Sequence, residues 1–168
     1  MSTRQQEHGG AASAVQEPTT LEVIAIPVAD VDRALGFYEG LGWRLDADYE
    51  PGPRFRIVQM TPPGSACSIQ LGRGVTPAAP GSAQGTYLVV SDLEQARADL
   101  ISRGAEVSGI YHNVYDSGEQ KRVVGPAPDG RSYASFASFT DPEATGGSCR
   151  RSRSGNPGGD PESGARST

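Results

Sequence analysis

LEVIAIPVADVDRALGFYEGLGW, residues 21–43, contains two patterns that predict a strand followed by a helix. The residues up to Pro27 are mostly apolar and β-branched, which is typical of a buried strand. Asp30 stands where its carboxylate can accept hydrogen bonds from the free N–H groups of a first helical turn. Apolar residues then recur at helical spacing as far as Leu41, and Gly42 can adopt the left-handed conformation that ends many helices. This stretch therefore predicts a strand, a capped amphipathic helix and a sharp stop.

Three short strands are predicted after this helix, at residues 43–49, 54–60 and 66–71, because β-prone runs alternate with Pro- and Gly-rich turns. Residues 21–72 then form one βαβββ module. The segment GRGVTPAAPGSAQG, residues 72–85, has the composition of a linker.

The same pattern restarts 62 residues later and predicts a second module over residues 85–143. A strand at 86–90 and a helix at 93–102 are followed by a strand at 106–111, a loop and a strand at 131–140. The identities at this offset fall on the strand end, the helix cap, the helix face and the stop glycine: Val28 on Val90, Asp30 on Asp92, Ala34 on Ala96 and Gly42 on Gly104.

The chain is thus expected to have an α+β fold of two tandem βαβββ modules, but without the last strand of the second module. Beyond Phe139 there is no Val, Ile, Leu, Met or aromatic residue, so residues 144–168 are expected to be a disordered tail. Residues 1–20 are expected to be a disordered leader, and residues 21–143 the domain.

Composition excludes several functional classes. The net charge is −5, and residues 20–143 carry sixteen acidic and ten basic groups, which argues against a nucleic-acid partner. No apolar run is long enough for a membrane span and the leader has no apolar signal core, so a cytoplasmic location is expected. Two cysteines, Cys67 and Cys149, make neither a disulfide framework nor a cysteine-rich zinc site. Fourteen of the fifteen basic residues are Arg, which is typical of a GC-rich genome.

The pattern PV-x-D-V-D-R-A-x-x-FYEGLGW at residues 27–43, with SFASFTDPE at 135–143, resembles the vicinal oxygen chelate superfamily. This group includes glyoxalases, bleomycin-resistance proteins and extradiol dioxygenases. The resemblance implies that each module curls its sheet into a half-barrel with one helix packed on it. It also implies a small-molecule pocket between the paired modules. Members often form dimers, so a homodimer is a candidate assembly.

A bacterial glyoxalase-like subgroup continues after the DPE motif as DGNGWLLQE, where the last strand supplies a glutamate. One inserted nucleotide and suitable codons turn residues 144–152, ATGGSCRRS, into GNGWLLQEV. We therefore hypothesise that residues 144–168 are a frameshifted tail, which the coding DNA would test directly.

Metal-dependent members of this superfamily place His, Gln or Glu on the first and fourth strands of each module. The resemblance maps these positions onto Val23, Gly85, Gln70 and the strand expected to be missing. Val and Gly cannot coordinate a metal, and one neutral Gln is too few ligands for catalytic zinc or iron. We therefore expect no cofactor and keep Gln70 as the one candidate ligand, with a divalent metal as the alternative if the positions are misaligned.

Strand alternation predicts the pocket wall. On the strand at 54–60 the Arg56 face is assigned to the pocket, because Phe55 and Ile57 suit a helix-facing core. Arg56 could then bind a carboxylate or phenolate, with a surface arginine as the alternative. His112 is a candidate general base, with an exposed loop histidine as the alternative. The predicted pocket residues are Val23, Ala25, Arg56, Val58, Met60, Ser68, Gln70, Gly85, Tyr87 and Tyr133.

Three functions are consistent with these residues. The first is a metal-free protein that sequesters a small molecule or catalyses a simple metal-independent conversion. The second is a divalent-metal-dependent lyase or dioxygenase of the same superfamily. The third is an inactive or interaction-only chain that lacks its last strand and keeps an unpaired sheet edge.

Overall fold

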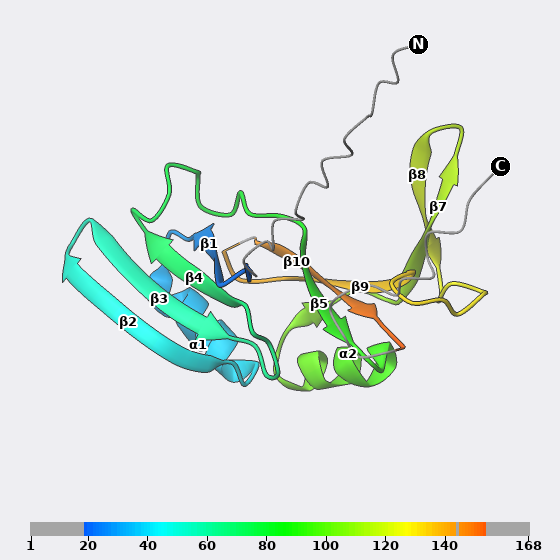
Figure 1. The fold of residues 1–168 in the computed structure, drawn as a ribbon, viewed down its shortest axis with the longest axis horizontal. Coiled ribbons are helices and arrows are strands. Elements are labelled where there is room, and N and C mark those ends of the chain that lie inside the picture. Colours follow the sequence, from blue (N-terminus) through cyan, green and yellow to red (C-terminus); the bar gives the residue numbers. More distant parts are fainter. Residues whose placement is uncertain (1–18, 144, 154–168) are drawn as a thin grey trace, which may run out of the picture.

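The computed structural model describes residues 19–143 and 145–153, which form two sheets with one helix packed on each (Figure 1). Most of the predicted leader at 1–20 and most of the predicted tail at 144–168 lie outside the described residues. Over the described part of the chain neither sheet closes into a barrel. The α+β architecture of two modules is confirmed.

Module one follows the predicted order of elements. Its sheet has the order β1-β4-β3-β2, with β1 and β4 parallel and the other pairs antiparallel. The elements are β1 (Val23–Pro27), α1 (Val31–Gly40), β2 (Arg44–Gly52), β3 (Phe55–Thr61) and β4 (Ser68–Arg73).

Module two repeats this order with additions. Its sheet runs β5-β10-β9-β7-β8, and β6 also pairs with β9. The elements are β5 (Thr86–Val90), α2 (Leu93–Ser102), β6 (Glu106–Val107), β7 (Tyr111–Asp116), β8 (Glu119–Val124), β9 (Ser135–Thr140) and β10 (Gly146–Arg151). The parallel pair β5–β10 corresponds to β1–β4, so the internal repeat is a structural repeat.

The helix caps show why the 62-residue repeat marks two modules. The carboxylates of Asp30 and Asp92 accept hydrogen bonds from the first-turn backbone N–H groups of Arg33 (3.0 Å) and Gln95 (2.9 Å). Each helix is followed by a glycine at positive φ, 82° at Gly42 and 89° at Gly104, where other residues would be strained.

The expected absence of the last strand is wrong. Residues 146–151 form β10 between β5 and β9, and both neighbours satisfy its backbone hydrogen bonds. Apolar side chains are scarce here, but Cys149 is buried, and the ring of Phe139 occupies the space where a Cβ on Gly147 would lie. A central strand can therefore form with few apolar side chains. Its two neighbours satisfy its backbone hydrogen bonds, and their side chains fill the space beside its small residues.

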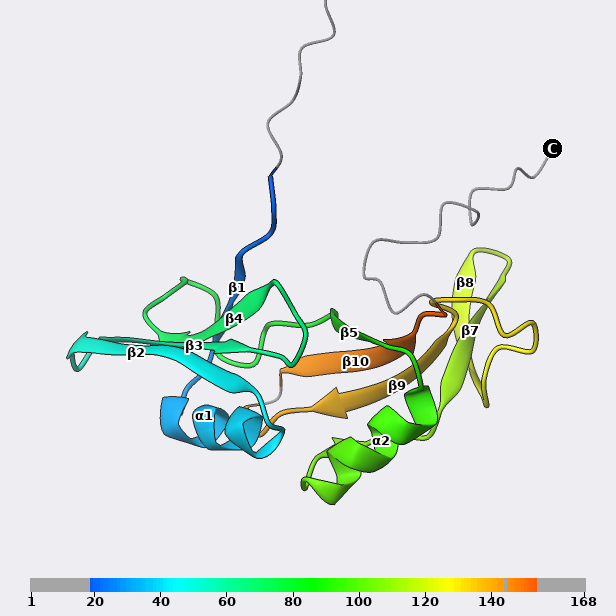
Figure 2. The ribbon, with the colours of Figure 1, turned by 60° about the horizontal axis from the view of Figure 1, so that its bottom comes forward.

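The predicted loop after the sixth strand is also wrong, because residues 111–124 form the β7–β8 hairpin. Ser117 and Gly118 at its tip both have positive φ, which is the geometry of a tight hairpin turn. Figures 1 and 2 show this hairpin projecting from the far end of module two.

The two modules are joined through the segment after β9. The buried carboxylate of Asp141 accepts a hydrogen bond from the Tyr38 hydroxyl of α1 at 3.0 Å. The Glu143 carboxylate accepts the backbone N–H groups of Ala29 (2.9 Å) and Asp30 (3.1 Å) at the start of α1. These bonds tie the end of β9 to the first helix and fix one module against the other.

Candidate functional site

Both helices lie on the same side of the two sheets, and within residues 19–143 and 145–153 no further layer covers the opposite sheet faces (Figure 2). Residues on the helix side form the apolar clusters, and residues on the other side are the candidates for binding. We call the two uncovered surfaces the open face of module one and the open face of module two.

The open face of module one carries four of the predicted pocket residues. In the parallel β1–β4 pair, Val23 lies opposite Ser68 and Ala25 opposite Gln70, so all four share one face. The Ser68 hydroxyl lies 2.7 Å from the Thr61 hydroxyl, which donates to Asp46. Hydrogen bonds from Thr61 and Arg44 lower the pKa of Asp46. These polar groups already have partners within the protein.

The predicted face of β3 is wrong by one residue. Val58 and Met60 are fully buried in the apolar cluster beneath α1, because they lie opposite Leu71 and Ile69 of that cluster. Gln59 lies opposite Gln70 and accepts a hydrogen bond from its side chain at 3.2 Å. Since neighbouring strands place paired residues on one face, Gln59, and not Val58 or Met60, belongs to the open face.

Arg56 shares the helix side with Val58 and is occupied by carboxylates. Its guanidinium donates to Asp48 at 3.0 and 2.8 Å and to Asp32 of α1 at 2.7 Å. Hydrogen bonds from Arg56 lower the pKa of Asp48, and the two aspartates raise the pKa of Arg56. Arg56 therefore fastens β3 to β2 and α1 and does not offer its charge to a ligand on the open face.

The open face of module two carries aromatic rings in a row across the sheet. The ring of Phe136 on β9 lies 6.2 Å from that of Tyr87 on β5 and 5.7 Å from that of Tyr111 on β7. Tyr111 and Phe136 are close to parallel, with 24° between their planes. Tyr87 is 49% exposed although it is a large aromatic residue. A row of rings of this kind on an uncovered surface can stack against a flat apolar molecule.

Two arginines contact the rings of this row, Arg150 on β10 between the strands of Tyr87 and Phe136, and Arg122 on β8 beyond Tyr111. The Arg150 guanidinium lies 4.8 Å from the ring centre of Tyr87 and 4.9 Å from that of Tyr133. The Arg122 guanidinium lies 4.5 Å over the Tyr111 ring. We call Tyr87, Phe136, Tyr111, Arg150 and Arg122 the aromatic–arginine strip.

Hydroxyl groups line the strip beside its rings. The Tyr111 hydroxyl lies 2.7 Å from the Ser138 hydroxyl, which lies 3.2 Å from that of Ser148. The strip is built by β5, β10, β9, β7 and β8 together.

Gly85, just before β5, has a φ of +79° and nothing within 4 Å of an added Cβ, so its role is conformational.

His112 lies on the other face of β7 from Tyr111. It pairs with buried Ser135, whereas Tyr111 pairs with Phe136 of the strip. The His112 Nδ1 is 2.9 Å from the Gly125 carbonyl oxygen, so Nδ1 carries the proton of that bond. The structure places His112 away from the strip and from the open face of module one, and brings it together with none of the predicted pocket residues.

The positions that the resemblance assigns to metal ligands do not make a coordination sphere. Val23 and Gly85 have no donor atoms, and the Gln70 amide nitrogen donates to Gln59. Among residues 19–143 and 145–153, no group of three or more His, Cys, Asp and Glu side chains is placed to hold a metal ion. The donor set of the described residues thus does not fit a divalent metal site.

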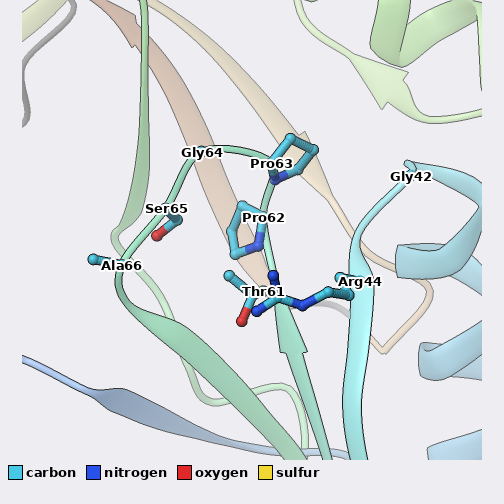
Figure 3. Close-up of a pocket in the computed structure, with 8 residues that line it drawn as sticks. All are labelled: Gly42, Arg44, Thr61, Pro62, Pro63, Gly64, Ser65 and Ala66. Atoms are coloured by element: carbon cyan, nitrogen blue, oxygen red, sulfur yellow. The ribbon is translucent and has the colours of Figure 1, made fainter.

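A separate hollow lies in module one. An open depression of about 480 Å³ lies between the β3–β4 turn, residues 61–66, and the start of β2 (Figure 3). Its walls are the rings of Pro62 and Pro63 on one side and Arg44 on the other. It contains none of the predicted pocket residues, and the Thr61 and Ser65 hydroxyls already have protein partners.

A family model matches residues 20–143 and is described as the Glyoxalase/Bleomycin resistance protein/Dioxygenase superfamily. The chain belongs to this superfamily. A comparison with curated protein sequences finds no match. No helix in the described part of this superfamily member is long and apolar enough to cross a membrane.

Solved structures give the same assignment. The chain is 26% identical to TnmS3, an antibiotic binding protein from Streptomyces sp. CB03234, with a TM-score of 0.61 over 82% of this chain and 98% of that one. It is 27% identical to a glyoxalase/bleomycin resistance protein from the same organism, with a TM-score of 0.57 over 78% and 99%. A superfamily member from Sphaerobacter thermophilus DSM 20745 shares the fold at 23% identity, with a TM-score of 0.61 over 80% and 98%.

Sequence reasoning missed most of the strip. Phe136 is not among the predicted pocket residues. Tyr111 and Arg122 were missed because the β7–β8 hairpin was predicted as a loop, although Ser117-Gly118 between β-prone runs was the available signal. Arg150 was missed because its strand was predicted to be absent.

Proposed function

We propose that this protein binds and sequesters a small aromatic molecule without a metal and without changing it chemically. The observation that carries the proposal is the row of Tyr87, Phe136 and Tyr111 on the open face of module two. Such rings on the helix side would be core residues, but here they face away from both helices. The similarity to an antibiotic binding protein adds support.

A homodimer is part of the proposal. The open face of module two carries the large aromatic side chain of Tyr87, which is 49% exposed within the described part of the chain. A second copy laid against an open face would cover a ligand on both sides. Light scattering during size-exclusion chromatography tests this, and a mass of one chain at micromolar concentration contradicts it.

Equilibrium dialysis against a panel of aromatic antibiotics, followed by mass spectrometry of the recovered compounds, tests sequestration. We expect at least one compound to be retained and recovered unchanged. Phe136→Ala should weaken its binding about tenfold, since one stacked ring contributes roughly 1–1.5 kcal/mol. Tyr49→Ala, on the open face of module one, is the matched control and should leave binding unchanged. Chemical conversion of the compound would contradict sequestration.

The alternative function is a divalent-metal-dependent lyase or dioxygenase. Elemental analysis of the purified protein separates the two, because stoichiometric tightly bound zinc, nickel, manganese or iron would contradict the metal-free proposal. The hypothesis of an inactive chain assumed that the last strand of module two is absent. The structure has β10 at that position.

A further inference from the structure

The arginines of the strip differ from the arginines of the module-one sheet in their electrostatic surroundings. Arg56 has Asp48 and Asp32 within 3 Å, and Arg73 has Glu50 at 2.9 Å. Among the described residues, no carboxylate lies within 4 Å of the Arg150 or Arg122 guanidinium. The Arg150 Nε is buried and has no hydrogen-bond partner among these residues. In a chain of net charge −5, the strip is therefore a local site of uncompensated positive charge.

The aromatic contacts of Arg150 use the face of its guanidinium, so the N–H groups at its edge can still donate hydrogen bonds. The rings of Tyr87 and Tyr133 lie 4.8 and 4.9 Å from its guanidinium carbon and use the positive charge through their π faces. A guanidinium donates its hydrogen bonds in its own plane, so an arginine held by aromatic rings can still bind a carboxylate through two parallel N–H groups. The neighbouring rings also exclude water on that side, which strengthens a charge-assisted bond.

The spacing of the rings defines the rest of the ligand. The centroids of Tyr87, Phe136 and Tyr111 follow one another at 6.2 and 5.7 Å, and Arg150 lies opposite Phe136 on the neighbouring strand. Phe136 and Tyr111 are within 24° of parallel, whereas Tyr87 is tilted by 59° to Phe136, so a flat fused-ring system can lie on the Phe136–Tyr111 pair but not on all three rings. We propose that the strip selects planar aromatic anions, with Arg150 binding the carboxylate or phenolate and Phe136 and Tyr111 binding the aromatic body. This inference rests on the proposed small-molecule function and adds the chemical class of the ligand.

The test compares 2-naphthoate with the neutral isostere 2-naphthamide by isothermal titration calorimetry on the full-length protein. We expect 2-naphthoate to bind about tenfold tighter or more, since a hydrogen bond to a charged group exceeds a neutral one by that order. Arg150→Gln should abolish the preference for 2-naphthoate over 2-naphthamide. Arg150→Lys, which keeps the charge but not the paired N–H groups, should retain part of it. Arg54→Gln makes the same charge change on an exposed residue beside β3 and is the matched control.

Protection of the Cys149 thiol from a thiol reagent verifies that Arg150→Gln retains β10. Equal affinities for the two compounds would overturn the inference, and so would a preference that survives in folded Arg150→Gln. Absence of binding by both compounds would overturn it as well. None of these results bears on sequestration itself, because retention of any antibiotic in the dialysis panel would still support the proposed function. If no antibiotic in the dialysis panel were retained, the proposed function itself would be contradicted.

Discussion

Module one and module two share a strand order, with additions in module two, but they differ in the number of apolar residues that they bury on the helix side. The larger apolar cluster takes eleven of its twelve buried residues from module one, and the other cluster has four, all from module two. Helix α1 buries Val31, Ala34 and Tyr38, whereas α2 buries only Leu93. Phe139 belongs to the module-two cluster, whereas Tyr87, Phe136 and Tyr111 lie on the open face of module two, in the strip.

This difference indicates a division of labour, in which module one supplies most of the buried core and module two supplies the proposed binding surface. Module one uses its rings, Tyr38 and Trp43, in the core, where their centroids are 4.7 Å apart, and its arginines in ion pairs. Module two places three of its rings and two of its arginines in the strip on its open face, and it is joined to module one through Asp141 and Glu143. A repeated fold can thus separate stability from binding, because each copy needs only one of its two sheet faces for packing.

The largest expected effect comes from matched truncations in the two cores. Leu71→Ala in module one should lower the free energy of unfolding by about 3–4 kcal/mol, because Leu71 is fully buried in the larger cluster. Leu93→Ala should cost only about 2 kcal/mol, because its small cluster at the start of α2 can relax around the cavity. Urea denaturation measures both. An equal or larger loss for Leu93→Ala would contradict the division of labour.

The link between the modules is expected to be the next most sensitive feature. Burial, followed by the charge of Asp141, raises the pKa of the Tyr38 hydroxyl, so it stays protonated and donates to that carboxylate. Tyr38→Phe leaves a buried carboxylate short of a donor and should cost about 1–3 kcal/mol.

Tyr49→Phe is the matched control for this change, since Tyr49 is 61% exposed, and it should stay within about 0.5 kcal/mol. If Tyr38→Phe were equally neutral, the Asp141 contact would not hold the modules together.

The sequence predicted the repeated plan well because the repeat is encoded in local chemistry. Asp30 and Asp92 cap their helices, and Gly42 and Gly104 end them, through interactions within a few residues. What failed depends on neighbours distant in sequence. The faces of Arg56 and Val58 are set by the register of β3 against β4, and β10 by its two partner strands. For the same reason the strip could not be assembled, because its members come from five strands.

The accessibility of the Cys149 thiol reports whether β10 forms and completes module two. Burial raises the pKa of its thiol to about 11, while Cys67 is half-buried in module one. We expect a thiol reagent at pH 8 to modify Cys67 much faster than Cys149 in the native protein. Rapid modification of both thiols would show that β10 does not form.

The raised pKa of the Cys149 thiol also makes the free energy of unfolding depend on pH. The folded state holds the Cys149 proton more tightly than the unfolded state, whose thiol titrates near 9.0. This contribution is fully present below pH 9 and is lost as the pH rises toward 11, by roughly 1–2 kcal/mol. Cys149→Ala should lack this alkaline loss in unfolding measurements, and an identical pH profile in both proteins would argue against burial of the thiol.

The smallest expected effect concerns the arginines that distinguish the two modules. Arg56 keeps the pKa of Asp48 below its ordinary value, so the pair stabilises the fold above pH 3.8, and this contribution is lost as the pH falls. Because Asp48 is partly exposed, Asp48→Asn should cost at most about 1 kcal/mol at pH 7 and progressively less under acidic conditions. Arg150→Gln breaks no carboxylate pair among the described residues and should not reproduce this pH dependence. If it did, Arg150 would have a carboxylate partner in the folded protein, and its charge would not be available to an anionic ligand.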